Sequence, residues 1–189
     1  MLTNIATTDA TFADLDYAGP NAESTRLFLA GNAVEFSLPG YEAPDGYRFM
    51  FASDLNQYRL VTTSDTPETV YVFQHDDNDP TRLIIFRYIG SQHDGALVGL
   101  VRGFFGWILA CRSIIVHGPD LAGPLRRFWH MMSSWALTEG YGLEAVSPAG
   151  QRALIRTEAQ LADFINEFRF ASHAHFRLVI RQEERRFNA

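Results

Sequence analysis

Apolar and polar residues alternate along much of the first half of the chain, with the period of two that is typical of a strand buried on one face. Tyr47, Phe49 and Phe51 show this alternation most clearly, and Asp45-Gly46 before them has turn chemistry. Similar breaks separate further segments of the same kind. The pattern predicts an antiparallel meander of five strands: Val34–Leu38, Tyr47–Ala52, Tyr58–Thr63, Thr69–Gln74 and Arg82–Tyr88.

Three other segments have the period or the end signals of a helix. Between Leu125 and Ala136, apolar residues recur at spacings of three, four and seven, and Gly140 follows as a stop. Thr157 with Gln160 three residues later has the spacing of a capping box. An earlier short helix is expected from Asn21 to Gly31. Strands are expected around the last helix at Leu143–Val146, Ala153–Ile155 and His175–Arg181.

The most apolar stretch of the chain, Ala96 to Val116, is long enough to span a membrane. It contains Arg102 and Arg112, and a central arginine opposes insertion by about 2.5–3.5 kcal/mol. Its glycines also disfavour a helix, by roughly 0.8–1 kcal/mol each. We therefore expect no membrane span here, and a buried hairpin instead: a strand Gly95–Arg102, a turn at Gly103–Gly106 and a strand Trp107–His117.

These elements together predict an α+β fold, with a curved, mainly antiparallel sheet and two to three packed helices. We find no internal repeat and no linker long enough to separate two domains. The prediction is a single domain over residues 1–189, whose first 20 residues can be irregular. The sequence does not indicate an oligomeric state.

Charge and cysteine content narrow the function classes. The formal net charge is −6, and the two arginine pairs are isolated from other basic residues. Nucleic acid is therefore not expected as a partner, because its phosphates need clustered positive charge. Cys111 is the single cysteine, which excludes an intramolecular disulfide and fits a reducing compartment. No secretory signal is visible at the N-terminus. The expected location is the cytoplasm, with delivery into another cell left open.

All 16 basic residues are arginine, and the chain contains no lysine. Codon usage in a GC-rich bacterial genome explains this most simply. Two functional explanations stay open beside it. An acyltransferase without lysine offers no side-chain amine to its own activity, and an effector without lysine offers none to ubiquitin ligases.

Common catalytic and metal-binding motifs are missing: no GxSxG, Walker loop, GxGxxG, CxxC or HExxH occurs. His173 and His175 alternate by two, but two ligands do not make a metal site. The run His75–Asp79 lacks the glycine and the final glutamate of a calcium loop. We therefore predict no metal. The tryptophans and phenylalanines are expected mainly in the core, although an apolar cleft beside the sheet stays open.

One region carries a more specific pattern. Asp94-Gly95 is followed by Val98-Gly99, then by an apolar segment that includes Ile114 and Val116. A loop from His117 to Pro124 and a helix that ends with Ala136 before Gly140 complete the pattern. This region, extended to residue 182, resembles the GNAT N-acyltransferase superfamily.

The resemblance implies transfer of an acyl group from acetyl-CoA or another acyl-CoA to the amine of a small molecule or a protein. The cofactor-binding residues would be the strand residues Ile114 and Val116, Gly123 of the loop, and Arg126 and Arg127 at the helix start, where amides and positive charge favour pyrophosphate. His117 or Glu144 would act as the catalytic base. Two departures weaken the match: Pro124 removes a loop amide, and Ile165 stands near the position of the family's usual tyrosine acid.

A different class of function fits the same sequence. A small acidic chain without a clear catalytic set is also typical of a non-catalytic protein-binding module, such as an inhibitor, an immunity protein or an effector. Such a module would use a sheet face or an aromatic cleft. A small-molecule carrier that uses the aromatic cleft is a third hypothesis.

Overall fold

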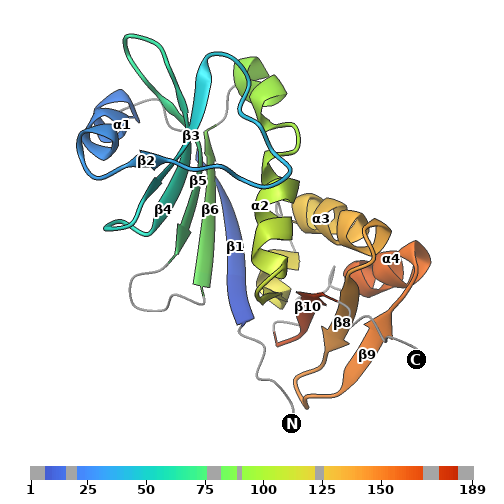
Figure 1. Ribbon diagram of the computed structural model, residues 1–189. Helices are drawn as coiled ribbons and strands as arrows, with labels where there is room; N and C mark the ends of the chain where they lie inside the picture. The colour runs from blue at the N-terminus through green and yellow to red at the C-terminus, as the bar shows by residue number, and fades with distance from the viewer. Residues whose placement is uncertain are drawn as a thin grey trace, which may run out of the picture. The chain divides into compact units, whose positions relative to one another are not determined.

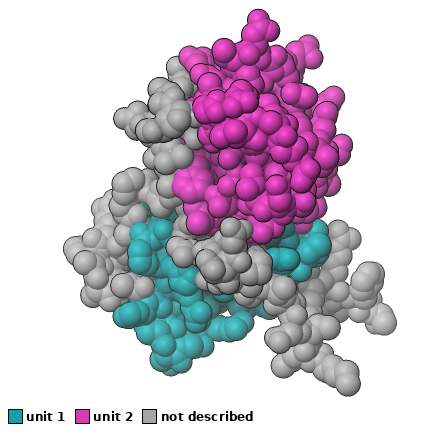
Figure 2. Space-filling view, turned by 90° about the vertical axis from the view of Figure 1, so that its left-hand side faces the viewer, with its two compact units in different colours: residues 1–10, 108–189 teal, residues 11–107 magenta. Residues whose placement is uncertain are grey.

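The computed structural model describes residues 7–15, 21–75, 82–88, 91–121, 126–167 and 175–182 (Figure 1). By their internal contacts the residues form two compact units, coloured separately in Figure 2. We call Thr11–Trp107 the meander unit, and Met1–Ala10 with Ile108–Ala189 the C-terminal unit. The single domain over residues 1–189 stays a prediction.

The predicted α+β class is confirmed. Among the described residues, helices accompany five antiparallel strands in the meander unit and four in the C-terminal unit, and neither set closes into a barrel. The strands of the meander unit are paired in chain order, as the alternating pattern predicted. They are β2 (Val34–Glu35), β3 (Tyr47–Ala52), β4 (Gln57–Thr62), β5 (Thr69–His75) and β6 (Arg82–Tyr88).

Two helices pack on opposite faces of this meander. On one face, Phe28 of α1 (Asn21–Ala30) forms a buried cluster with Met50, Ala52 and Val61 of the sheet. The Asn21 side chain ties the start of α1 to β5, because its Nδ2 donates to the Thr69 carbonyl at 2.9 Å. Aromatic rings on the other face contact α2 (Leu100–Leu109). The short helix η1 (Ser91–Leu97) precedes α2.

The predicted hairpin over Gly95–Arg102, Gly103–Gly106 and Trp107–His117 is wrong, because most of this stretch is helical and only its end is a strand, β7 (Ser113–His117). Leu100, Phe104 and Ile108 are all buried and lie four residues apart, so a helix places them on one face. Their burial outweighs the helix-breaking tendency of the glycines. Among the described residues, no helix is long and apolar enough to cross a membrane.

The glycine inside α2 has a packing reason. A Cβ built on Gly103 would lie 3.2 Å from Tyr41 Cβ and 3.4 Å from the Pro39 carbonyl oxygen, so the turn before β3 approaches the helix too closely for a larger residue. We expect Gly103→Val to lower the free energy of unfolding by about 1–2 kcal/mol through overpacking. Urea denaturation measures the change. Gly95→Ala, which meets no atom within 4 Å, is the control and should change stability by less than about 0.5 kcal/mol.

Tyr41 provides a second test of how the turn before β3 packs against the helical segment. Its hydroxyl donates to the Ala96 carbonyl at 2.7 Å, and burial raises its pKa from 10.0 to about 12. Between these values the unfolded chain binds fewer protons than the folded one, so the stability that this shift contributes is complete below pH 10 and is lost as the pH rises towards 12.

We expect urea denaturation to show a smaller stability loss over pH 10–12 for Tyr41→Phe than for the unchanged chain. Tyr141, whose pKa is also raised by burial, is present in both proteins, so the difference isolates Tyr41. Lysine titration, which usually obscures this range, is absent because the chain has none. Equal losses in the two proteins would contradict the assignment.

In the C-terminal unit the strand order is β7, β10, β8, β9, antiparallel throughout. The first residues of β1 (Thr7–Leu15) add a parallel pairing along β7. The other elements are η2 (Gly118–Leu121), α3 (Arg126–Thr138), β8 (Gly142–Val146), β9 (Arg152–Ile155), α4 (Glu158–Glu167) and β10 (Arg177–Arg181).

Both helix boundaries predicted in this unit are confirmed by their caps. Gln160 donates its backbone N–H to Thr157 Oγ1 at 3.2 Å, at the start of α4. Gly140 has φ of +82°, and Tyr141 N–H donates to the Ala136 carbonyl at 2.9 Å, which is the bonding of a helix that ends in a left-handed residue.

Candidate functional site

A third strand lies between the two strands that would hold a cofactor in the acyltransferase hypothesis. That hypothesis leads us to expect a V-shaped gap between the strand ending at Val116 and the one beginning near Leu143. Instead, β10 lies between β7 and β8 and pairs with both. Leu178, for example, is opposite Val116 on one side and Ala145 on the other, so the backbone groups between these strands are used by the sheet.

The proposed cofactor residues have mixed positions. Ile114 and Val116 are fully buried in β7, in the core of the unit. Arg126 is half-buried, and its guanidinium donates to Asn166 Oδ1 of α4. Arg127 is exposed in the first turn of α3. Gly123 lies outside the described residues. Of the described members, Arg127 is exposed and Arg126 is partly exposed, whereas Ile114 and Val116 are buried.

The two proposed catalytic residues lie two strands apart. His117 ends β7 and is half-buried, whereas Glu144 is in the middle of β8 and buried, with β10 between them. Adjacent strands are about 4.8 Å apart, so the two backbones are separated by roughly 10 Å. They are not placed to share a proton directly.

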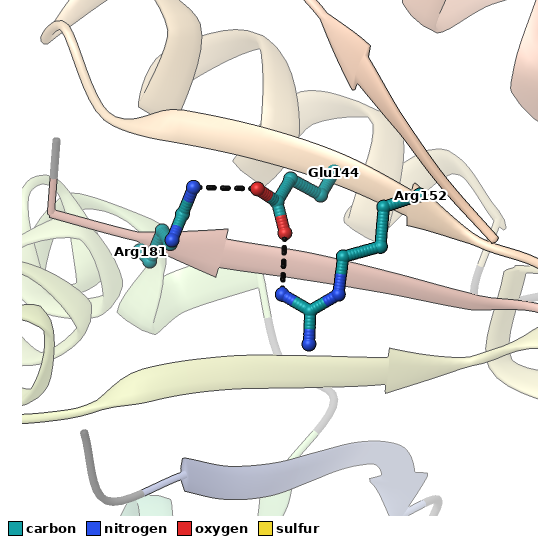
Figure 3. A network of polar contacts seen from close by, with 3 residues as sticks. All are labelled: Glu144, Arg152 and Arg181. Carbon is teal, nitrogen blue, oxygen red and sulfur yellow. Dashed lines mark hydrogen bonds and ion pairs between the residues drawn. The ribbon is translucent and has the colours of Figure 1, made fainter. Parts of the chain in front are cut away.

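Glu144 is instead the centre of an ion-pair network (Figure 3). Its Oε2 accepts from Arg152 of β9 at 3.0 Å, and its Oε1 accepts from Arg181 of β10 at 2.5 Å. The carboxylate is 6% exposed, while the arginine side chains are 64% and 39% exposed. One buried anion therefore fixes two arginines that reach solvent.

The network belongs to one face of the four-stranded sheet. Along β10, Leu178 and Ile180 are buried, whereas Arg177, Val179 and Arg181 are at least partly exposed. Because neighbours in register share a face, Val179 lies in one row with Ile115 of β7, Glu144 of β8 and Leu154 of β9. The rows through Arg177, Val179 and Arg181 place the following side chains on this side, and we call them the open face: Ile115, His117, Glu144, Arg152, Leu154, Arg177, Val179 and Arg181.

The two faces of this sheet therefore differ in chemistry. The opposite face carries the fully buried Ile114, Leu143 and Leu178, on the sheet that α3 contacts. On the open face, Glu144 interrupts the row of the apolar residues Ile115, Val179 and Leu154, and arginines lie on both sides of that row. Three arginines against the single charge of Glu144 give its described side chains a charge of +2, in a chain whose net charge is −6.

Glu144 is among the residues predicted from the sequence, but the arginines around it are not. A signal was present, because Arg177, Val179 and Arg181 alternate with the apolar residues of the same strand. That alternation predicts an arginine-bearing face on β10. The position of β9, which brings Arg152 and Leu154 to the same face, depends on strand order and is not readable from local pattern.

Several aromatic residues of the described part of the chain lie in the core, as predicted. Trp129, Phe73 and Phe104 are fully buried, and Trp107 packs edge-on against Tyr58 with ring centroids 5.6 Å apart. The described residues include no group of three or more metal-ligating side chains. His173 and most of the run after His75 lie outside the described residues, and His175 is in a turn before β10.

Comparisons with models of protein families, with curated proteins and with solved structures found no match for this chain.

Proposed function

We propose that the protein is a non-catalytic binding module that presents the open face to a protein partner. The observation that supports this most is the row in which Val179 pairs with Ile115 on one side and with Glu144 on the other, because arginines lie in the rows on both sides of it. Arginine is one of the residues that contribute most to protein association. The positive charge favours a partner with an acidic surface.

Glu144 contributes to this function by holding two of the arginines in place. An arginine fixed before association loses less side-chain entropy when the complex forms. Because Glu144 has a separate oxygen for each arginine, both guanidinium groups keep further N–H donors for a partner's carboxylates. In this proposal Glu144 is a positioning residue and not a base.

Photocrosslinking in cells of the source organism tests the proposal. A benzophenone amino acid at Val179 should give one discrete protein adduct, and adding Arg177→Glu should remove most of it. The control places the same residue at Asp163, which is exposed on α4. No adduct at Val179, or the same adducts at both positions, would overturn the proposal.

Acyl transfer from an acyl-CoA stays a prediction of the family resemblance. Arg127, exposed at the start of α3, is the described residue that still suits it. A ligand present at a hundred times its dissociation constant stabilises a fold by about 2.7 kcal/mol, so acetyl-CoA should raise the melting temperature if it binds. Arg126→Ala with Arg127→Ala should abolish that rise. No rise for the unchanged chain would exclude acetyl-CoA as the ligand.

A further inference from the structure

The outer edge of β9 lies beside the open face. In the strand order of the C-terminal unit, β9 is last and pairs with β8 alone among the described strands. Arg152, Ala153 and Leu154 are exposed, and Leu154 keeps 48% of its surface. An exposed edge strand offers unpaired backbone groups to another extended chain.

The hydrogen-bond phase shows which backbone groups point outward. Ser147 N–H donates to the Gln151 carbonyl at 2.9 Å where β8 turns into β9. In an antiparallel pair, bonded and non-bonded pairs alternate, so Ala153 is bonded to β8 whereas Arg152 and Leu154 are not. The N–H and C=O groups of Arg152 and Leu154 therefore point away from β8.

The same row ends at Arg156. Its N–H donates to Gln160 Oε1 at 2.8 Å, so the helix start of α4 already uses the next outward donor. The edge thus offers the backbone of two residues, flanked by the arginine side chains of Arg152 and Arg156. Arg152 does not guard the edge, because Glu144 holds its guanidinium over the sheet face.

The charge pattern argues against a second copy of this chain as the occupant. If two β9 strands paired antiparallel about Leu154, each Arg152 would lie opposite the Arg156 of the other copy. Like charges directly opposite each other destabilise a strand pair. An extended segment with acidic residues opposite Arg152 and Arg156, and an apolar residue opposite Leu154, has the complementary pattern.

We propose that an acidic, extended segment of the partner adds to β9 as a further strand, with the spacing acidic-x-apolar-x-acidic. This inference rests on the proposed function and names its partner class. The backbone of Leu154 supplies the strand pairing, and the open face receives the side chains that lie beyond it. Main-chain hydrogen bonds then give affinity, while the alternate side chains give specificity.

A labelled peptide tests this inference on the full chain. The probe is a fluorescein-labelled, capped peptide Thr-Glu-Thr-Val-Thr-Glu-Thr, and the control peptide has Lys in place of both Glu. Fluorescence anisotropy at low salt should show at least tenfold tighter binding of the acidic peptide. Raising the salt should weaken that binding, because the arginine contacts are exposed.

Matched variants separate backbone from side-chain effects. Leu154→Pro removes an outward N–H without removing a bond to β8, so it should weaken binding of the acidic peptide at least tenfold. Leu154→Ala keeps that N–H and should weaken binding of the same peptide only two- to fivefold. Circular dichroism checks the fold. If the proline variant does not fold, Arg156→Glu leaves the backbone intact and should reduce the preference for the acidic peptide at least fivefold.

The outcomes also separate this inference from the proposed function. No binding of the acidic peptide, equal binding of both peptides, or no effect of a folded Leu154→Pro variant would overturn the edge proposal. For a chain in which the proline variant is unfolded, an unchanged preference in Arg156→Glu would do the same. A discrete adduct at Val179 would then still support the open face. Peptide binding at the edge without any adduct at Val179 would support the edge and overturn the open face.

Discussion

Replacing Phe104 by alanine is expected to lower the free energy of unfolding by about 4 kcal/mol. Phe104 is fully buried, and its ring stacks on Phe73 with centroids 3.8 Å apart and planes 14° apart. Tyr58 and Trp107 lie against the same ring at 5.1 Å and 5.5 Å. Truncating a buried phenylalanine usually costs 3–5 kcal/mol, because apolar contacts are lost and a cavity is left.

Urea denaturation followed by near-ultraviolet circular dichroism measures this effect, because the signal comes from the clustered aromatic rings. Val98→Ala is the control: Val98 lies just before α2 but is 78% exposed, so its truncation should change stability by less than about 0.5 kcal/mol. A loss below about 2 kcal/mol for Phe104→Ala would contradict the packing of α2 on the meander.

Removing both arginines of the Glu144 network is expected to destabilise the protein by about 2–3 kcal/mol. Arg152→Ala with Arg181→Ala leaves a carboxylate that is 6% exposed without its two ion-pair partners. Stripping the partners from a buried charge typically costs 3–5 kcal/mol. We expect less here because the arginines themselves are exposed, so water can enter the space they leave.

Glu144→Leu is the informative comparison for this network. It removes the buried charge and leaves two arginines that already reach solvent, so stability should change by less than about 1 kcal/mol. Thermal denaturation of both variants at neutral pH measures the difference. Equal losses in the two variants would show that Glu144 is not effectively desolvated.

The meander was predictable from sequence because its information is local. In β3, the aromatic residues Tyr47, Phe49 and Phe51 occupy every second position, and turn residues lie before the strand. The strand has the predicted bounds. Thr157 likewise begins a helix through a side chain that acts within a few residues. Asn21 differs, because its side chain bonds Thr69, which is far away in the sequence. Such patterns survive in any fold that buries one side of each element.

The prediction of a hairpin was wrong because the deciding contacts are not local. Between residues 95 and 109 both periods can be read, and the glycines favour the strand interpretation by local propensity. Residues far away in the sequence stabilise the helix instead. Phe73 of β5 stacks on Phe104, and the chain at Pro39 lies so close to the helix that a side chain larger than that of Gly103 would crowd it. Those contacts join residues that are far apart in the sequence, so the local sequence does not predict them.

The candidate site divides in the same way. The sequence by itself determined the α+β class, the five-stranded meander, the caps of the later helices and the alternation that places Arg177, Val179 and Arg181 together on one side of a strand. These follow from period and backbone chemistry. Only the tertiary structure decided that β10 lies between β7 and β8, because strand order depends on pairing between segments far apart in the chain. In that order β10 separates β7 from β8, Glu144 lies between two arginines, and β9 is the last of the described strands.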